Sequence, residues 1–284
     1  MVPIITDPGE MQRWSESQRL AGKRIGVVPT MGALHEGHLS LIRLARERAD
    51  KVITTIFVNP MQFGPGEDFQ RYPRDPTHDV ELCAAAGTDV VFLPDVAGIY
   101  PEGFATSVNV GGITEVLEGA VRPGHFRGVA TIVTKLFHLT KPHIAVFGQK
   151  DAQQIAVIKR MVADLNIDVS IAVAPIVREK DGLAMSSRNA FLTPRQRGEA
   201  VVLFRALQLG ERIIHEGERN PREVRTAMES LIGNESSGVA DYVSLADNAS
   251  LKEVEALTPG TVLLLSLAVR FGPTRLIDNI VVQL

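Results

Sequence analysis

Hydrophobic and polar positions alternate along the first 175 residues in a way that predicts strands and helices in turn. Residues 24–29 (RIGVVP) form a short apolar run, and residues 39–50 (LSLIRLARERAD) carry apolar positions at helical spacing. The β-branched run 51–58 (KVITTIFV) predicts the next strand. The alternation continues with helices expected around 78–87, at 129–142 and at 151–166, and strands at 89–94, 143–148 and 168–175. This order predicts an α/β fold, a Rossmann-like parallel sheet wrapped by helices.

The pattern changes near residue 175. Residues 177–189 (VREKDGLAMSSRN) predict a turn-rich connector, and residues 194–217 predict one long helix. Strands are expected at 239–246, 261–269 and 274–284, with few helices between them. We therefore expect two domains, a Rossmann-like domain over residues 1–176 and a smaller C-terminal α+β domain over residues 177–284.

Composition narrows the classes of function. No run reaches the 18 or so uninterrupted apolar residues of a membrane span, and the first residues lack the layout of a signal peptide, so we expect no membrane association and a cytoplasmic location. A single cysteine, Cys83, excludes an intrachain disulfide and a cysteine-based zinc cluster, and its neighbours predict a buried helix face. The net charge of −3 disfavours nucleic acid as a partner. A charged small molecule is the expected ligand.

Polar residues gather where the predicted strands end, which is where parallel sheets bind ligands. The stretch 27–42 (VVPTMGALHEGHLSLI) follows the first strand and sets His35 and His38 before a helix expected from about Leu39. Two interpretations stay open: a polar loop, or a phosphate site in which both imidazoles reinforce the anion affinity of the helix N-terminus. Zinc is disfavoured because the spacing is not that of HExxH and a third ligand is not evident. No metal-ligating residue is predicted.

Lys150 lies at the start of a predicted helix, where its charge opposes the helix dipole at a cost of about 0.3–1 kcal/mol. A bound polyphosphate would offset that cost, and a solvated lysine is the alternative. Asp151 and Gln154 have the spacing of a capping box, which gives Gln154 a structural interpretation too.

Two more segments have both a structural and a functional interpretation. Gln62 follows the strand at 51–58, and it either holds a substrate carboxylate or caps a turn. Asp181 and Gly182 predict a hairpin turn. Residues 186–188 (SSR) then form either plain loop or a set of donors for a triphosphate.

Six blocks follow one another along the chain: PTMGALHEGHLSLI (29–42), FVNPMQF (57–63), RYPR (71–74), RPGHFRGV (122–129), FGQKDAQQ (147–154) and DGLAMSSRN (181–189). In this order and spacing they resemble the pantoate:β-alanine ligase family. The resemblance is dense over residues 20–195 and looser over the C-terminal third. Gln149 departs from the family pattern, where Glu is more often expected.

The resemblance implies a role for each matching residue. It implies that His38 donates a proton, that His35 and Lys150 contact the phosphates, and that Gln62 and Gln154 hold pantoate, Gln62 also guiding β-alanine. It further implies a homodimer. The implied ATP-binding residues are Met31, Gly32, Ala33, Leu34, His35, Glu36, Gly37, His38, Gly148, Gln149, Lys150, Asp151, Val177, Met185, Ser186, Ser187 and Arg188.

The implied reaction has two steps and needs no nucleophile from the enzyme. The pantoate carboxylate attacks the α-phosphorus of Mg–ATP and releases pyrophosphate, and the amine of β-alanine then displaces AMP from pantoyl adenylate. The C-terminal domain is expected to act as a lid that excludes water from this labile intermediate. A nucleotidyltransferase acting on a phosphorylated substrate shares the two-histidine motif. Gln62 and Gln154 favour the ligase. A nucleotide sensor without catalysis is disfavoured by Lys150, His38 and MSSR together.

Overall fold

The computed structural model describes residues 2–284 and divides the chain into two compact units. The first unit comprises the chain up to Thr114 together with Arg122–Gln149 and Gln154–Pro175. The second comprises Glu115–Val121, Lys150–Gln153 and Ile176–Leu284.

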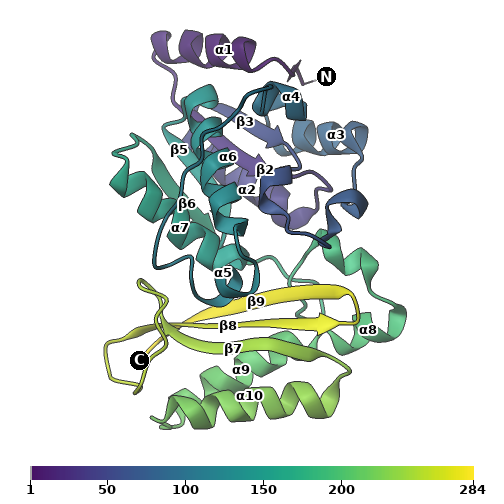
Figure 1. Cartoon of the computed structure of the whole chain (residues 1–284), viewed down its shortest axis with the longest axis vertical. Helices are drawn as coiled ribbons and strands as arrows, with labels where there is room; N and C mark the ends of the chain where they lie inside the picture. The colour runs from purple at the N-terminus through teal and green to yellow at the C-terminus, as the bar shows by residue number, and fades with distance from the viewer. Residues whose placement is uncertain (1) are drawn as a thin grey trace. The chain divides into compact units, whose positions relative to one another are not determined.

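A parallel sheet forms the centre of the first unit (Figure 1). Within residues 2–284 it has six strands in the order β1-β4-β3-β2-β5-β6. The order reverses between β2 and β5, because the chain adds strands first on one side of β2 and then on the other. The strands are β1 (Ile4–Ile5), β2 (Ile25–Thr30), β3 (Lys51–Ile56), β4 (Val90–Phe92), β5 (Ile144–Gly148) and β6 (Ser170–Ala174).

Helices pack on both faces of this sheet. Along β2, Ile25 and Val27 pack with α1, α6 and α7, whereas Val28 packs with α2 and α3. Cys83 is fully buried on α3, as predicted. The helices are α1 (Pro8–Leu20), α2 (Glu36–Arg48), α3 (Pro76–Ala86), α4 (Val96–Ile99), α6 (His125–Thr140) and α7 (Ala152–Asp164), with short 3-10 helices η1 (Pro60–Gln62), η2 (Asp68–Arg71) and η3 (Gln149–Asp151).

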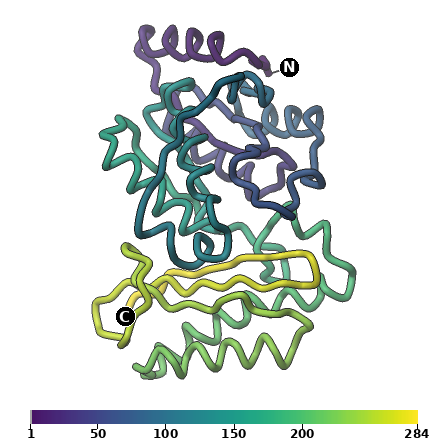
Figure 2. Tube along the Cα trace, viewed as in Figure 1, coloured from purple at the N-terminus to yellow at the C-terminus, as the bar shows by residue number. Residues whose placement is uncertain are grey.

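The second unit is built on an antiparallel sheet, and Figure 2 shows its three C-terminal strands running back and forth beside one another. Leu263, Leu265 and Leu267 alternate along β8 toward helices α9 and α10. Helix α5 lies on the opposite face (Figure 1). The elements are α5 (Leu117–Val121), η4 (Ser187–Phe191), α8 (Pro194–Glu199), α9 (Val202–His215), α10 (Pro221–Glu235), β7 (Val239–Asp247), β8 (Val262–Phe271) and β9 (Thr274–Gln283).

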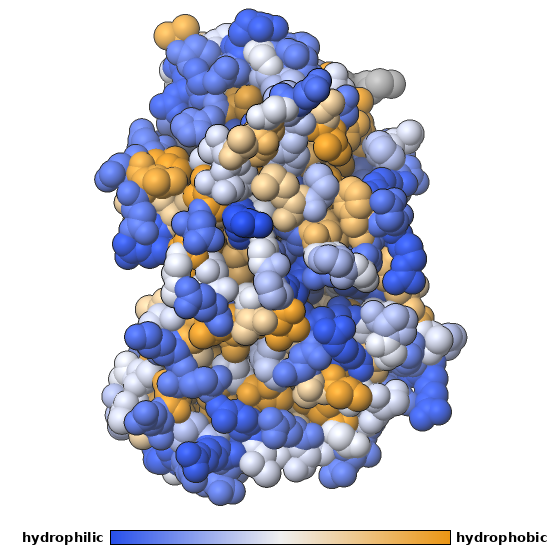
Figure 3. Space-filling model, viewed as in Figure 1, coloured by the Kyte–Doolittle hydropathy of each residue, from blue (hydrophilic) through white to orange (hydrophobic). Residues whose placement is uncertain are grey.

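This architecture confirms the predicted fold class, a helix-wrapped parallel sheet followed by a smaller α+β region. Hydrophilic residues cover most of the face in Figure 3, and the hydrophobic ones there lie in small scattered groups. None of the helices in residues 2–284 combines the length and the apolar composition that a bilayer span requires.

The prediction of one helix over 194–217 is wrong. The chain forms α8 and α9, separated at Ala200 and Val201, where Leu203 N–H bonds the Ala200 carbonyl in a tighter i→i+3 turn. This turn lets Ala200, Val202 and Leu203 all enter the core. Helix α10 was not predicted either, because its polar face dominates the sequence of residues 221–235.

Candidate active site

The loop after β2 is held in a fixed conformation by a buried carboxylate. Gly32 and Ala33 both have positive φ, +81° and +51°. Asp79, on α3 and only 2 % exposed, accepts the N–H of Ala33 at 2.9 Å and of Leu34 at 2.8 Å. A Cβ at Gly32 would lie 2.8 Å from Asp79 Oδ2, so glycine is required where the loop passes the carboxylate.

The loop leads directly into α2 and fixes both histidines at the helix N-terminus. His35 is the N-cap, and its Nδ1 accepts the Gly37 N–H at 3.1 Å. His38 Nδ1 faces the backbone N–H of His35 at 3.3 Å. Because both Nδ1 atoms accept, each neutral ring carries its hydrogen on Nε2. The ring centroids lie 4.1 Å apart, so two N–H donors are paired at the positive end of the helix dipole.

Helix α2 begins at Glu36 and not at about Leu39 as expected. The difference arises because His35 supplies the cap, a role that Ser, Thr, Asp or Asn usually fills. His38 therefore belongs to the first helical turn. Glu36 is exposed and pairs with Arg43, and this hydrogen bond lowers the pKa of its carboxyl group.

Gln62 ends the 3-10 helix after β3, and its side chain is oriented from both ends. Asn59, 1 % exposed, donates from Nδ2 to Gln62 Oε1 at 3.1 Å. Gln62 Nε2 lies 3.2 Å from the sulfur of Met31. The structure thus brings the predicted pantoate ligand beside the predicted ATP loop. Tyr100 donates to Asn59 Oδ1 at 2.7 Å, and burial raises the pKa of this phenol.

The segment after β5 contains the predicted lysine. Lys150 lies in η3 and is half-buried, and its carbonyl accepts the side-chain N–H of Asn279 at 2.9 Å. Asn279, on β9, is 3 % exposed. Next to it, Asp278 makes two hydrogen bonds with Arg178, at 2.6 and 3.0 Å. Burial raises the pKa of Asp278 in spite of this partner.

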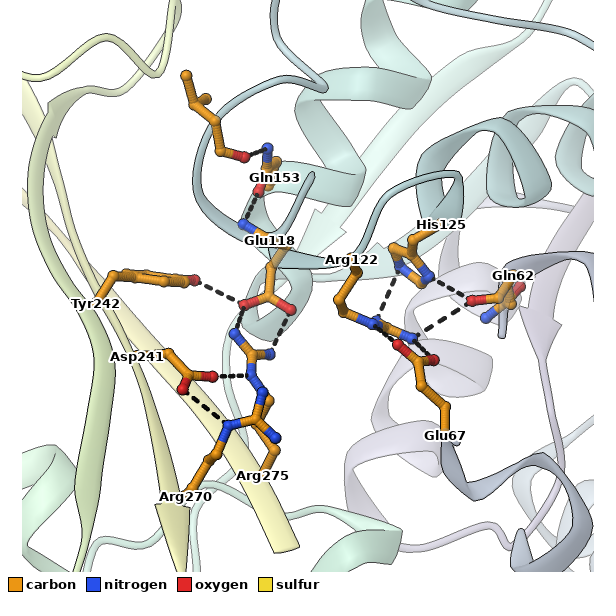
Figure 4. Close-up of polar contacts among 11 residues, drawn as sticks. Gln62, Glu67, Glu118, Arg122, His125, Gln153, Asp241, Tyr242, Arg270 and Arg275 are labelled. Atoms are coloured by element: carbon orange, nitrogen blue, oxygen red, sulfur yellow. Dashed lines mark hydrogen bonds and ion pairs between the residues drawn. The ribbon is translucent and has the colours of Figure 1, made fainter. Parts of the chain in front are cut away.

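The two adjacent glutamines of α7 have different environments. Gln153 is 5 % exposed, accepts the Glu118 N–H at 2.9 Å and donates to the Val116 carbonyl at 2.8 Å (Figure 4). Gln154 is half-buried. Gln153 therefore has a structural task, and the role of Gln154 in binding pantoate stays a prediction.

The predicted hairpin at Asp181 and Gly182 is present, with Gly182 N–H bonded to the Glu179 carbonyl and Gly182 at φ +96°. The N–H of Met185 bonds the Val177 carbonyl at 3.0 Å. This bond links two of the residues that are predicted to contact the nucleotide. Ser186 then caps η4 by accepting the Arg188 N–H. Residues 185–188 are half-buried.

The predicted residues divide between the units. Met31 to His38, Gln62, Gly148, Gln149 and Gln154 belong to the first, and Lys150, Asp151, Val177 and Met185 to Arg188 to the second. Asp79, Asn59 and Asn279 were not predicted as residues that support the site. Asp79 could have been found from the sequence, because it is a carboxylate among the positions of the buried face of α3, with Val80, Cys83 and Ala86. No sequence pattern pointed to Asn279.

The chain matches the model of the pantoate-β-alanine ligase family over residues 3–281. It is 53% identical over 280 residues to the pantothenate synthetase of Acetivibrio thermocellus, covering 99% of both chains. The crystal structure of pantothenate synthetase from Thermus thermophilus superposes with a TM-score of 0.91 at 43% identity, covering 98% of this chain and 99% of that one.

A pantoate-β-alanine ligase from Francisella tularensis, solved with β-γ ATP and β-alanine, matches with a TM-score of 0.82 at 34% identity, covering 99% of this chain and 97% of that one. The family model spans all of the predicted motifs and nearly all of both units. The chain belongs to the pantoate-β-alanine ligase family.

Proposed function

We propose that the chain joins the carboxylate of pantoate to the amine of β-alanine at the expense of ATP. Full-length similarity to named pantothenate synthetases supports this reaction. The observation that carries it is the pair of Nε2–H donors at the N-terminus of α2. Such a pair suits a substrate whose reacting group is a phosphate.

In the first step an oxygen of the pantoate carboxylate forms a bond to the α-phosphorus of ATP, and the bond to pyrophosphate breaks. In the second step the β-alanine nitrogen bonds the acyl carbon, AMP leaves with the former carboxylate oxygen, and the nitrogen loses a proton. Lys150 and Arg188 neutralise phosphate charge, His35 and His38 donate hydrogen bonds to the phosphates, and His38 is the proton donor. ATP would enter as its complex with Mg²⁺, which would supply positive charge to the phosphates.

The substrate contacts follow the family resemblance. Met31 to His38, Gly148 to Asp151, Val177 and Met185 to Arg188 bind ATP. Gln62 and Gln154 bind pantoate through their amides, and Gln62 also guides β-alanine. The proximity of Gln62 to Met31 of the ATP loop supports the assignment of Gln62 to pantoate, because the pantoate carboxylate must reach the α-phosphate of ATP.

Residues 1–176 act as the domain that binds ATP and pantoate, and residues 177–284 act as the lid. The enzyme works as a homodimer in the cytoplasm, without nucleic-acid or membrane partners. The net charge of −3 supports the small-molecule assignment. Sedimentation equilibrium tests the dimer: a mass near 31 kDa in place of about twice that value contradicts it.

One assay tests the reaction. The protein is incubated with Mg–ATP and pantoate, with and without β-alanine, and the nucleotide products are separated. AMP and pyrophosphate are expected to accumulate steadily only when both substrates are present. Steady ADP formation would point to an acyl phosphate and overturn the adenylate route, and AMP transfer to a phosphorylated acceptor would indicate a nucleotidyltransferase.

A further inference from the structure

The block RPGHFRGV, residues 122–129, has no task in the reaction as proposed. It begins at Arg122 and continues into α6. Figure 4 shows that Arg122 and His125 both point toward Gln62 and that Arg122 also meets Glu67. The block therefore surrounds the main chain of a proposed pantoate ligand.

The hydrogen-bond partners of His125 define which ring nitrogen carries hydrogen. His125 Nε2 lies 3.2 Å from Nη1 of Arg122, and a guanidinium can only donate, so Nε2 accepts. The hydrogen is then on Nδ1, 2.8 Å from the carbonyl oxygen of Gln62. His125 thus donates to the Gln62 backbone in the tautomer that Arg122 selects.

Arg122 is itself held by a carboxylate. Its Nε and Nη2 donate to Glu67 at 2.8 and 2.6 Å, and its Nη2 also lies 3.4 Å from the Gln62 carbonyl. The side chains of Arg122 and Glu67 are only 16% and 25% exposed. Burial acts to raise the pKa of Glu67, but the hydrogen bonds and charge of Arg122 outweigh it, so the pKa lies below its usual value.

Gly128 of α6 packs against the backbone of Met61 and Gln62. A Cβ at this position would lie 2.2 Å from the Met61 carbonyl oxygen and 2.6 Å from the Gln62 nitrogen. The peptide of Gln62 therefore rests directly on the helix backbone. His125 and Gly128, three residues apart, lie on the same face of α6.

We propose that Arg122, His125 and Gly128 form a main-chain clamp on Gln62 and that Arg122 and His125 are positioning residues for pantoate. The clamp fixes the backbone from which the Gln62 amide reaches the substrate, while Asn59 orients the amide itself. This inference rests on the proposed role of Gln62. A misplacement of about 1 Å in such a group can cost about 10²-fold in rate, so the clamp is expected to affect pantoate much more than ATP.

Replacing His125 by Asn or by Gln tests which ring nitrogen of His125 must donate to Gln62. His125→Asn places an N–H near the Nδ1 position and keeps the bond to Gln62, whereas His125→Gln places it near Nε2 and loses that bond. We expect the pantoate KM of His125→Gln to rise about tenfold, with the ATP KM within about twofold and His125→Asn near wild type. Arg122→Lys, which loses the two parallel bonds to Glu67, is expected to resemble His125→Gln, and Arg127→Lys on the exposed side of α6 is the matched control.

A double-mutant cycle separates positioning from general damage. In a Gln62→Ala background, Arg122→Lys and His125→Gln are expected to have no further effect on pantoate KM, because the group that they position is absent. Additive effects in that background, or equal pantoate KM for His125→Asn and His125→Gln, would overturn the clamp. Wild-type enzyme whose AMP formation does not depend on pantoate would contradict the proposed function, which is a separate result visible before any variant is made.

Discussion

The carboxylate of Asp79 accepts the backbone N–H of Leu34 at 2.8 Å, and the two residues are 45 positions apart in the chain. It also accepts the N–H of Ala33, so one buried side chain fixes the start of the loop that presents His35 and His38. Hydrogen bonds to a charged acceptor each contribute about 1.5–3 kcal/mol.

Asp79→Ala is therefore expected to lower the free energy of unfolding by about 2–4 kcal/mol and to weaken ATP binding, because the loop loses both bonds. Urea titration and ATP calorimetry measure the two effects. Glu81→Ala, on the exposed side of the same helix, should change neither. Unaltered ATP affinity in folded Asp79→Ala would show that the loop holds its conformation without the carboxylate.

Lys150→Ala and His38→Ala are each expected to lower turnover by about 10²–10³-fold, or roughly 2.7–4 kcal/mol, because each removes a donor to developing phosphate charge. Melting temperatures should change little, since both side chains are only half-buried. Lys159→Ala and His138→Ala, both exposed, are the controls. A variant that melts much earlier yet keeps its turnover would assign that residue a purely structural role.

Gln153 and Gln154 form a matched pair. Gln154→Ala should weaken pantoate capture and leave ATP binding and melting near normal. Gln153→Ala should lower the free energy of unfolding by about 1–3 kcal/mol, because the Glu118 N–H and Val116 carbonyl lose a buried partner. Pantoate calorimetry and thermal melts on both variants decide this, and exchanged phenotypes would mean that the glutamines have the opposite tasks.

Strands with a regular apolar pattern were the most predictable part of the molecule. β3 and β5 lie where residues 51–58 and 143–148 predicted them, since a strand buried on both faces needs a continuous apolar run. Helix ends were less predictable, as the start of α2 shows. His35 is an unusual cap, and it follows a loop that is held by Asp79, a residue far away in the sequence.

Most of the residues that support the site could not be predicted from the sequence. Asn59 and Asn279 act through side-chain bonds to Gln62 and to the Lys150 carbonyl, and Asn279 lies 129 positions from its partner. Periodicity reports burial and local geometry, and it contains no information about a pair as distant in the sequence as Asn279 and Lys150. The family resemblance supplied residues for substrate contact but not the residues that hold them.

The ion-pair cluster of the second unit should be strongly destabilised by loss of its central arginine. Arg275 donates to Glu118 at 2.6 and 2.7 Å and to Asp241 at 2.6 Å, and all three side chains are less than 17% exposed (Figure 4). Arg275→Leu is expected to cost about 3–5 kcal/mol, because two buried carboxylates lose their partner. Arg270→Leu, whose arginine is 45% exposed, should cost about 0–1 kcal/mol. Equal losses in urea titrations would contradict this ranking.

Glu67 should make the first unit sensitive to acid. Its pKa is lowered in the folded state, so its stabilisation is present above the ordinary value of 4.5 and is lost as the pH falls through the lower folded value. The difference in unfolding free energy between wild type and Glu67→Gln should therefore be constant near pH 7 and shrink below about pH 4.5. Glu47→Gln, at an exposed position, gives the baseline, and a difference independent of pH would exclude this linkage.

The bonds of Glu118 also have a consequence for biosynthesis. Tyr242 and Arg275, which bind its carboxylate, follow it by 124 and 157 residues. On a translating ribosome, the strands of the parallel sheet emerge long before these partners, because β6 ends at Ala174. The Glu118 carboxylate therefore pairs with Arg275 only after β9 has been synthesised, and until then the nascent chain combines an ordered sheet with an incomplete second unit.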